Sequence, residues 1–490
     1  MVHSDRRPPE DRQQSALRAA MQFADLSLEQ LWMRYFSLGG HADLVDLDAH
    51  LTGLVRLPPT EADVLAHAVN ERLDELIAER RVPYSRPLRT TRPTTGPLAA
   101  LVDLLGAAGS SPPERLPALA ASAGRTLGVE VEVHLIDHEQ RSLVRVGGTA
   151  APEAQSVDGT MAGRAFRADE ILLSEREDGP RMWVPIIDGA DRIGVLEVAT
   201  GAAADLHDPG LRQQCTWLAR MLGHLIVSMQ PYGDELERLR RHRPLTTSAE
   251  LIWQQLPPLT AATDDFVLAG MLEPSYRVGG DAFDYAFSET AVSLGIFDAV
   301  GHGVPAALMS AGALAGYRSA RRDARGLFDQ AAAIDAVVAE AFPGSAFVTG
   351  VLGEVELSSG RLRYLNAGHP PPVLLRGGKV VKQLTGGRRV PFGLDVTGVA
   401  IAEELLEPGD WLCLYTDGIA EARDASGAWF GEDRLMDFLS REIAAGQPPA
   451  ETVRRLTQAV LRHQGGLLQD DATVLLARWM HVGPDRRRPG

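Results

Sequence analysis

Cysteine is scarce in this sequence. Only Cys215 and Cys413 occur among its 490 residues, about 200 positions apart. This spacing excludes a disulfide framework and the paired cysteines of a zinc finger. We therefore expect both thiols to be reduced and buried in the core of a cytoplasmic protein.

Long apolar runs and a positive charge balance are also missing. The N-terminal stretch MVHSDRRPPEDRQQS lacks the apolar core of a signal peptide. The most hydrophobic helical run, 217–229, contains Arg220 and His224 and is too short to span a bilayer. The formal net charge of -16 argues against nucleic acid or an anionic membrane as the main partner.

A chain of 490 residues is long enough for two or three domains. The helical part near the N-terminus is short for an independent core, so we expect it to dock on another surface or on a second copy. The composition predicts seven segments: disordered residues 1–25, a helical module 26–82, a linker 83–97, an α/β sensor segment 98–204, a coupling helix 205–247, an α+β domain 248–480 and a tail 481–490.

The α/β segment alternates helical and strand patterns. VEVEVHLID (129–137) predicts a half-buried strand, and residues 182–200 predict a hairpin. Together with SVDGTMAGRAF (156–166), this order resembles a GAF domain, a small sensory α/β fold. The resemblance implies a small-molecule ligand; the alternative is a scaffold that binds nothing. We expect His134 and His138 to be exposed strand-end residues rather than haem or metal ligands.

The predicted coupling helix ends in DELERLRRHRP (234–244). Its charges are most simply a solvated helix face. The sharper alternative is a connecting helix that pairs with a partner copy and carries a signal into the next domain, which would make the chain a homodimer.

The C-terminal region combines strands with helices. Short turns such as 358–360 favour antiparallel pairing, and helices collected outside the strands favour an α+β sandwich of two packed sheets. The expected strands are 266–273, 291–297, 347–356, 361–366, 411–415 and 473–478, and the expected helices are 303–320, 326–341, 432–445 and 450–464.

One aspartate at the end of a strand is predicted to face the core rather than the solvent, where a charged side chain normally lies. Strand side chains alternate, so Asp298 shares a face with Val292, Leu294 and Ile296. A lone buried carboxylate costs several kcal/mol unless it is paired or protonated. Its position therefore indicates a function.

Three more aspartates repeat this pattern. Asp281 follows glycines in RVGGDAFD, Asp470 precedes the last strand, and Asp417 ends WLCLYTDG on the same face as Cys413 and Tyr415. Converging carboxylates with few basic neighbours suit a hard cation such as Mg²⁺ or Mn²⁺. The sequence has no His/Cys spacing of the kind that zinc prefers.

The motifs occur in a recognisable order. GGDAFDY, FDAVGHGVPAALMSA, NAGHPPPVL, LYTDGIAEARD and DDATVLLAR resemble the metal-dependent PPM (type 2C) protein serine/threonine phosphatases, and more closely their bacterial SpoIIE-type branch. The resemblance implies an α-β-β-α sandwich of two antiparallel sheets. It also implies a phosphoserine or phosphothreonine substrate on an anti-sigma-factor antagonist, with activity controlled by the N-terminal sensor region.

The resemblance further implies a site with two Mn²⁺ or Mg²⁺ ions. Asp298 would bridge both ions. Asp281 and the carbonyl of Ala299 would bind one ion, and Asp417 and Asp470 the other. Two such ions lower the pKa of a shared water, which would attack phosphorus in line without a covalent enzyme intermediate.

Several neighbours are expected to shape the site. Gly280 precedes the first ligand, and Gly301 and Gly303 let the backbone turn after Asp298. His302 is either a proton donor or a residue of the loop and helix start. Asp471 stands where many relatives have Asn and is expected to support the ligands.

The sequence departs from the eukaryotic members. Val300 stands where they have a histidine, and their phosphate-gripping arginine has no match, so the general acid is not assigned. His369 in NAGHPPP is expected mainly to form a rigid turn. Glu421 and Asp424 either reach a third metal or cap the next element.

The rival hypotheses are a phosphoprotein-binding scaffold, which would lack some of the four aspartates, and a phosphatase silent until dimerised or ligand-bound.

Overall fold

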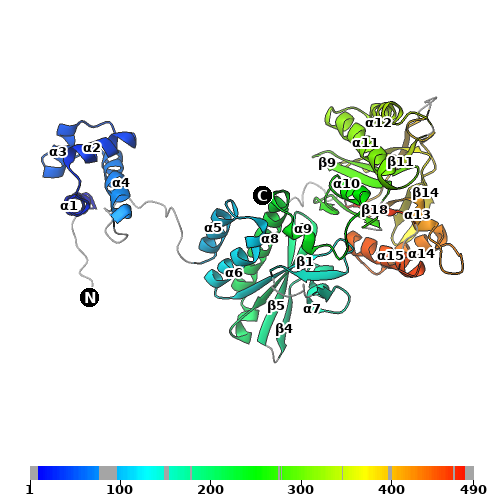
Figure 1. Cartoon of the computed structure of the whole chain (residues 1–490), viewed down its shortest axis with the longest axis horizontal. Coiled ribbons are helices and arrows are strands. Elements are labelled where there is room, and N and C mark those ends of the chain that lie inside the picture. Colours follow the sequence, from blue (N-terminus) through cyan, green and yellow to red (C-terminus); the bar gives the residue numbers. More distant parts are fainter. Residues whose placement is uncertain are drawn as a thin grey trace. The chain divides into compact units, whose positions relative to one another are not determined.

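The chain forms two compact units, Met1–Pro93 and Thr94–Gly490, in the computed structural model (Figure 1). Residues 1–8, the predicted tail and most of the predicted linker lie outside the described residues. The structure describes residues 9–76, 96–147, 154–176, 179–273, 276–277, 279–344, 346–394, 400–466 and 470–480.

The described part of the first unit, residues 9–76, consists of four helices around a small apolar core. The core contains the fully buried side chains of Leu31, Tyr35 and Leu65. Ser27 and Gln30 form the predicted capping box at the start of the second helix. The helices are α1 (Pro9–Ala24), α2 (Leu28–Ser37), α3 (Leu44–Thr52) and α4 (Pro59–Leu76).

Helix α1 corrects one prediction. Residues 9–24 were expected to be disordered, but Leu17, Ala20 and Ala24 are buried in the core of this unit. Their three- and four-residue spacing places them on one helical face. The charged residues around them hide this stripe in the sequence.

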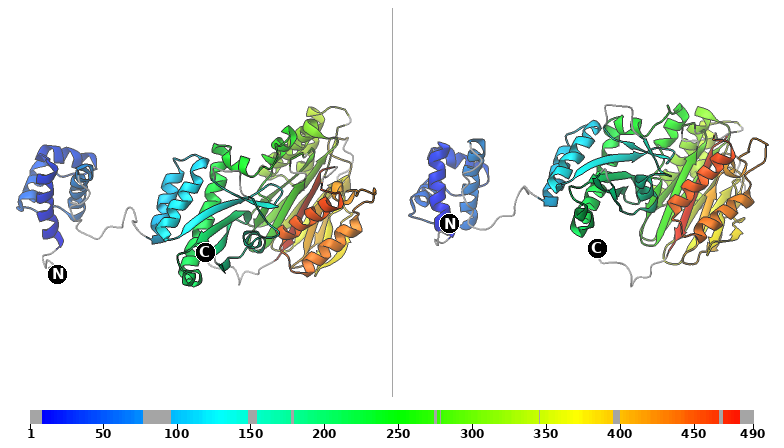
Figure 2. Two further views of the ribbon diagram at one scale, coloured as in Figure 1. Left: turned by 60° about the horizontal axis from the view of Figure 1, so that its bottom comes forward. Right: turned by 90° about the horizontal axis from the view of Figure 1, so that it is seen from below.

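The second unit begins with an antiparallel sheet, called here the first sheet, with strand order β3-β2-β1-β6-β5-β4. Helices α5, α6 and α8 pack on one face through a shared apolar core, and α7 packs on the other (Figures 1 and 2). The predicted hairpin is β5–β6. The elements are α5 (Gly96–Ala108), η1 (Pro113–Arg115), α6 (Leu116–Leu127), β1 (Glu130–Ile136), β2 (Ser142–Arg145), β3 (Ala154–Ser156), α7 (Met161–Ala168), β4 (Leu172–Arg176), β5 (Gly179–Asp188), β6 (Asp191–Ala199), η2 (Ala203–His207) and α8 (Pro209–Met229).

No continuous coupling helix spans 205–247. Helix α8 ends at Met229, and the short η3 (Gln230–Tyr232) and α9 (Glu235–Leu239) follow. Pro231 lacks a backbone donor and Gly233 adopts an extended conformation, so the helix cannot continue. Cys215 and Leu218 of α8 are buried against the first sheet, which makes α8 part of that core. None of the described helices is both long and apolar enough to cross a bilayer.

Two further sheets follow α10 (Thr247–Trp253), and all their strand pairs are antiparallel except β12 with β15. The second sheet has the order β15-β12-β11-β10-β9 with β16 beside β12, and the third has the order β14-β13-β17-β18-β8-β7. The strands are β7 (Thr260–Ala262), β8 (Phe266–Glu273), β9 (Asp281–Phe287), β10 (Ala291–Ala299), β11 (Val348–Glu356), β12 (Arg361–Ala367), β13 (Val373–Arg376), β14 (Lys379–Gln383), β15 (Arg388–Arg389), β16 (Ala402–Leu405), β17 (Trp411–Tyr415) and β18 (Ala472–Trp479).

The two sheets pack face to face with helices outside, which confirms the predicted α+β class with antiparallel sheets (Figures 1 and 2). Helices α11 (Gly303–Arg322) and α12 (Leu327–Ala341) cover the second sheet. Helices α14 (Glu432–Ala444) and α15 (Pro449–His463) cover the third. All predicted strands and helices of this region are present, with ends shifted by at most two residues.

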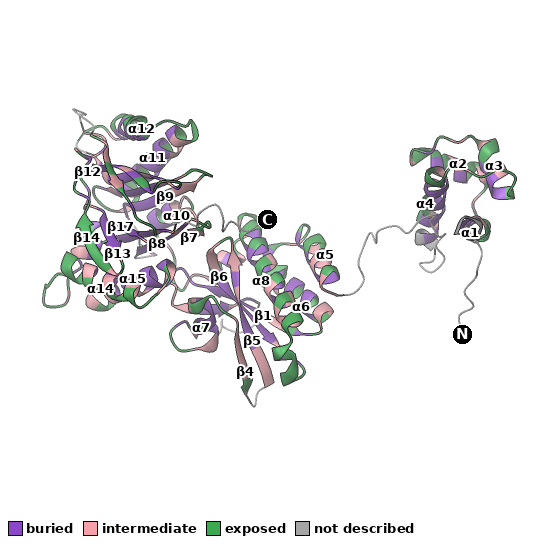
Figure 3. Cartoon of the chain, turned by 180° about the vertical axis from the view of Figure 1, so that it is seen from behind, coloured by how far each residue is buried: buried purple, intermediate pink, exposed green. Residues whose placement is uncertain are grey.

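The sandwich core explains the direction of β10. Val292, Leu294 and Ile296 are fully buried on one face, while Phe297 on the other packs against Tyr317 of α11 at 5.7 Å between ring centres. In Figure 3 strands β8, β13 and β17 of the third sheet are coloured mostly as buried. The face that carries Asp298 therefore lies toward the third sheet, as the alternation predicts.

A buried charge cluster attaches α11 to β9. The Asp284 carboxylate is 2% exposed and accepts hydrogen bonds from Arg318 at 2.7 and 3.1 Å. Arg321 adds an ion pair at 2.9 Å. The two arginines compensate the burial of the carboxylate only while both elements stay in place.

We expect Asp284→Ala to lower the free energy of unfolding by about 3–5 kcal/mol, because two partly buried guanidinium groups lose their partner. The exposed Asp323 at the end of α11 pairs with Arg325, and Asp323→Ala should cost less than about 1 kcal/mol. Urea unfolding followed by tryptophan fluorescence measures both. Equal losses would show that the Asp284 cluster does not hold α11.

Candidate functional site

Two of the predicted ligands lie directly opposite each other. Asp281 at the start of β9 pairs with Asp298 on β10, and Asp298 pairs with Thr349 on β11. Directly opposite residues of a ladder share a face. The three side chains therefore form a row across the second sheet, on the side of the third sheet.

The other two ligands come from the third sheet, but Asp417 reaches its position by a different route than predicted. Cys413 and Tyr415 belong to the core under α14 and α15, so a continued strand would direct Asp417 away from the sandwich. Strand β17 instead ends at Tyr415, and Asp417 begins the short helix α13 (Asp417–Ala420). Asp470 stands just before β18, as expected.

The electrostatics show that these carboxylates face one another. Burial raises the pKa of Asp298 to about 7, and the charges of Asp417, Asp470 and Asp471 add to this shift. Burial, and then the charge of Asp298, raise the pKa of Asp281 well above its usual range. No cationic side chain of the described residues is among the main influences on either group. The site therefore has uncompensated negative charge.

The carboxylates converge without closing into a tight cluster. Among the described residues, the only group of three or more possible ligand atoms within 4.8 Å of one another is Glu132, His134 and Glu197 of the first sheet. Mutual repulsion of like charges opposes a closer approach of the four aspartates.

Thr416 is a site residue that the sequence reasoning missed. Its hydroxyl donates to Oδ2 of Asp281 at 2.7 Å and accepts the N–H of Thr473 at 2.9 Å. Thr416 is fully buried and thereby ties the second sheet's carboxylate to the third sheet. The signal was available, because Thr416 alternates with Leu412 and Leu414, which face the sandwich core.

Asp471 holds the loop before Asp281. Its Oδ2 accepts the backbone N–H groups of Gly279 and Gly280 at 2.7 and 2.6 Å and that of Asp281 at 3.3 Å. A Cβ at Gly280 would lie 2.6 Å from the carbonyl oxygen of Ala299. Only glycine therefore lets the loop pass this carbonyl, which lies beside the predicted first ligand.

The glycines after Asp298 adopt the conformations that their type allows. Gly301 and Gly303 have φ values of +97° and +74°, so the chain turns sharply into α11. His302 between them is exposed and occupies the N-cap position without a capping hydrogen bond from its side chain. The structure thus places His302 in the loop and helix start.

The NAGHPPP segment is a braced turn that also reaches the site. Asn366 donates to the carbonyl of His369 at 2.9 Å and accepts its N–H at 2.8 Å. The Nδ1 of His369 lies 2.8 Å from the hydroxyl of Thr349, which is also hydrogen-bonded to Asp298. Burial lowers the pKa of His369 to about 3, so its ring is neutral. Thr349 is a second residue that the sequence reasoning missed.

Glu421 and Asp424 have separate roles. After burial, the charge of Glu421 is the largest cause of the raised pKa of Asp417. Asp424 instead accepts backbone N–H groups of Ser426 and Ala428 at 2.8 and 3.0 Å. It therefore caps the following turn, which was one of the two alternatives.

A comparison with known protein families found one that matches part of this chain. Residues 288–480 match the family described as Stage II sporulation protein E (SpoIIE). This range contains Asp298, Asp417 and Asp470 but begins after Asp281.

Individual relatives match parts of the chain. The Protein IcfG of Synechocystis is 29% identical over 131 residues, 27% of this chain and 20% of that protein. The phosphoserine phosphatase RsbU of Bacillus subtilis is 22% identical over 217 residues, 42% of this chain and 61% of that protein. The chain thus spans less than two thirds of either curated relative. The solved SiaA-PP2C domain of Pseudomonas aeruginosa is 25% identical, covers 43% of this chain and 85% of that domain, and has a TM-score of 0.39.

The raised pKa of Asp298 predicts how the metal-free protein responds to pH. Its folded-state pKa of about 7 exceeds the unfolded value near 3.8, so the folded state binds more protons between these values. Stability should therefore fall as the pH rises from about 4 through about 7.

We expect the melting temperature of EDTA-treated protein to fall over this pH range by less in Asp298→Asn than in the wild type. The exposed Asp323→Asn is the matched control and should follow the wild type. Parallel curves for all three proteins would contradict a half-buried Asp298 that is protonated in this pH range.

Proposed function

We propose that the chain is a metal-dependent phosphatase acting on phosphoserine or phosphothreonine in proteins. The premise is that residues 288–480 of this chain belong to the SpoIIE family of PP2C-type phosphatase domains. The observation that carries the proposal is the facing of two pairs of aspartates. Asp281 and Asp298 lie opposite each other on the second sheet, and Asp417 and Asp470 approach from the third.

The donor set fits a pair of hard divalent cations. Carboxylate and carbonyl oxygens without compensating cationic side chains are the ligands of Mn²⁺ and Mg²⁺. We assign Asp298 to both ions, Asp281 and the Ala299 carbonyl to one, and Asp417 and Asp470 to the other. When bound, such ions lower the pKa of a coordinated water and neutralise charge on the phosphoryl group.

The chain's own residues position these ligands. Thr416 donates to Oδ2 of Asp281 and thereby fixes the orientation of this carboxylate. Asp471 fixes the loop that leads into Asp281 and so supports it without binding metal itself. Thr349 bridges Asp298 and the neutral ring of His369, which restrains the carboxylate at the centre of the site.

The substrate class is the finer part of the proposal. RsbU of Bacillus subtilis is named a phosphoserine phosphatase, and it matches 42% of this chain. We assign this chain a phosphorylated anti-sigma-factor antagonist as substrate, within a partner-switching pathway that regulates a sigma factor. The reduced, buried Cys215 and Cys413 suit the cytoplasm as the place of this activity.

We also propose that the region around the first sheet is a GAF-like sensor that controls the phosphatase and acts in a homodimer. A chain of contacts supports this control. Asp137, just after β1, lies 2.7 Å from the ring Nε2 of His242, and the backbone N–H of His242 donates to the Tyr276 hydroxyl at 2.8 Å. Tyr276 stands five residues before Asp281. A movement of the first sheet would thus reach the loop that ends at Asp281.

Replacement of the central ligand tests the activity. We expect Asp298→Asn to lower Mn²⁺-dependent turnover of a phosphoserine peptide by at least about 100-fold, because one ligand charge shared by both ions is lost. The exposed Asp437→Asn on α14 should retain wild-type turnover. A metal titration of both variants measures this, and full turnover by Asp298→Asn would refute the proposed site.

The contact of His242 tests the sensor control. We expect His242→Ala to raise the Mn²⁺ concentration needed for half-maximal activity by about 5-fold, since a lost hydrogen bond of about 1 kcal/mol loosens the loop before Asp281. His224→Ala removes an exposed histidine that pairs with Asp188 and should change nothing. Identical Mn²⁺ dependence in the two variants would show that the contact carries no signal.

A further inference from the structure

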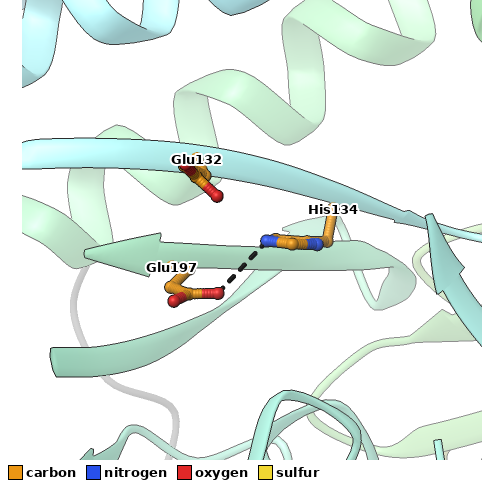
Figure 4. A group of neighbouring side chains, drawn as sticks. All are labelled: Glu132, His134 and Glu197. Atoms are coloured by element: carbon orange, nitrogen blue, oxygen red, sulfur yellow. Dashed lines mark ion pairs between the residues drawn. The ribbon is translucent and has the colours of Figure 1, made fainter. Parts of the chain in front are cut away.

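A second group of ligand-type side chains lies far from the phosphatase carboxylates in the fold. Glu132 and His134 stand on β1, and Glu197 stands directly opposite Glu132 on β6. One ligand atom from each residue lies within 4.8 Å of the other two. Figure 4 shows the three side chains converging on the same side of the two strands.

His134 is the unusual member of this group. Its side chain is 2% exposed, and neither ring nitrogen makes a hydrogen bond with any of the described residues. The Nε2 atom points at Glu197 and lies 3.3 Å from its Oε2 (Figure 4). Apart from this 3.3 Å contact with Glu197, the buried imidazole is unsatisfied, and a ligand shared with the two carboxylates would relieve that.

The two carboxylates are held in place but not fully used. Glu197 is 7% exposed; the His134 ring, and then Arg181, hold its pKa at about 2, so it is ionised. Arg181 contacts Oε1 of Glu197, and Arg145 contacts Oε1 of Glu132. Both arginine side chains are about a third or more exposed, at 34% and 42%, so their charged ends reach solvent. The second oxygen of Glu197 faces His134.

We propose that Glu132, His134 and Glu197 bind one divalent transition-metal ion, with Zn²⁺ as the best match. One imidazole nitrogen with two carboxylates is a mixed nitrogen and oxygen donor set, which suits Zn²⁺ better than Mg²⁺ or Ca²⁺. Three protein ligands also leave a coordination position open for a further ligand. This site differs in donor chemistry from the all-oxygen phosphatase site and does not depend on it.

Arg145 and Arg181 set a condition on binding. They neutralise the two glutamates before the ion arrives, so the cation must displace their charged ends into the solvent that these already contact. The alternative is that His134 is protonated and forms only an ion pair with Glu197. Metal binding separates the two, because an ion pair takes up no Zn²⁺.

The test uses the full-length chain with Asp298→Asn and Asp417→Asn, so that the phosphatase carboxylates do not retain metal. Equilibrium dialysis against Zn²⁺ and elemental analysis should give one ion per chain. Adding Glu132→Gln should weaken binding at least about 10-fold, and His134→Gln should do the same. His207→Gln is the matched control, because His207 forms an exposed pair with Glu175 at 2.9 Å and should leave binding unchanged.

The outcomes separate cleanly. Equal Zn²⁺ binding by all variants, or no binding by the parent protein, would overturn the proposal. Glu132→Gln is decisive if His134→Gln does not fold, because Glu132 is partly exposed and its replacement keeps the shape. Co²⁺ added to the same proteins gives a second readout: a visible absorption band should appear in the parent and disappear in Glu132→Gln.

Discussion

Repulsion between carboxylates at one end of the sandwich is the constraint on which the rest of this region depends. Asp281 and Asp298 lie directly opposite each other in a ladder, where like charges destabilise the pairing. Burial then raises the pKa of both groups. The strands nevertheless stay paired, because contacts farther from this end hold them together. These contacts are the apolar face of β10 and the charge cluster of Asp284.

The division of the site between two sheets follows from the same constraint. One sheet that carried all four aspartates would have no means of separating their charges. Here the packing of the two sheets sets the distance between the carboxylates of the second sheet, which include Asp298, and those of the third sheet, which include Asp417. The hydrogen bond that Thr416 donates to Asp281 and those that Asp471 accepts from the loop at Gly280 cross that gap. The polar links are short and buried, so the geometry is fixed before any cation binds.

The sequence predicted what alternation controls. The face of Asp298, the antiparallel sandwich and the ends of the six predicted strands followed from periodicity, whereas β7, β13, β14, β15 and β16 were not predicted. It failed where the chain leaves a regular element: Asp417 is reoriented by the end of β17, and β9 was overlooked because Asp281 and Asp284 interrupt its apolar pattern. Alternation with Leu412 and Leu414 places Thr416 on the core face, but its bond to Asp281, like the contacts of Thr349, joins distant strands that no local pattern records.

The two histidines of β1 and its end show a different kind of failure. His134 and His138 were expected to be exposed, yet they are 2% and 5% exposed. His138 is covered by Trp253, whose ring lies 4.9 Å away, and pairs with Glu237 at 2.7 Å. Burial lowers the pKa of His138. The elements that cover this polar side chain therefore keep it buried, although burial is unfavourable for the side chain itself. Polar contacts of this kind fix an orientation rather than add stability, and they can rearrange at low cost. If the region around the first sheet is the proposed sensor, such polar contacts would transmit a small shift of β1 that an apolar interface would resist.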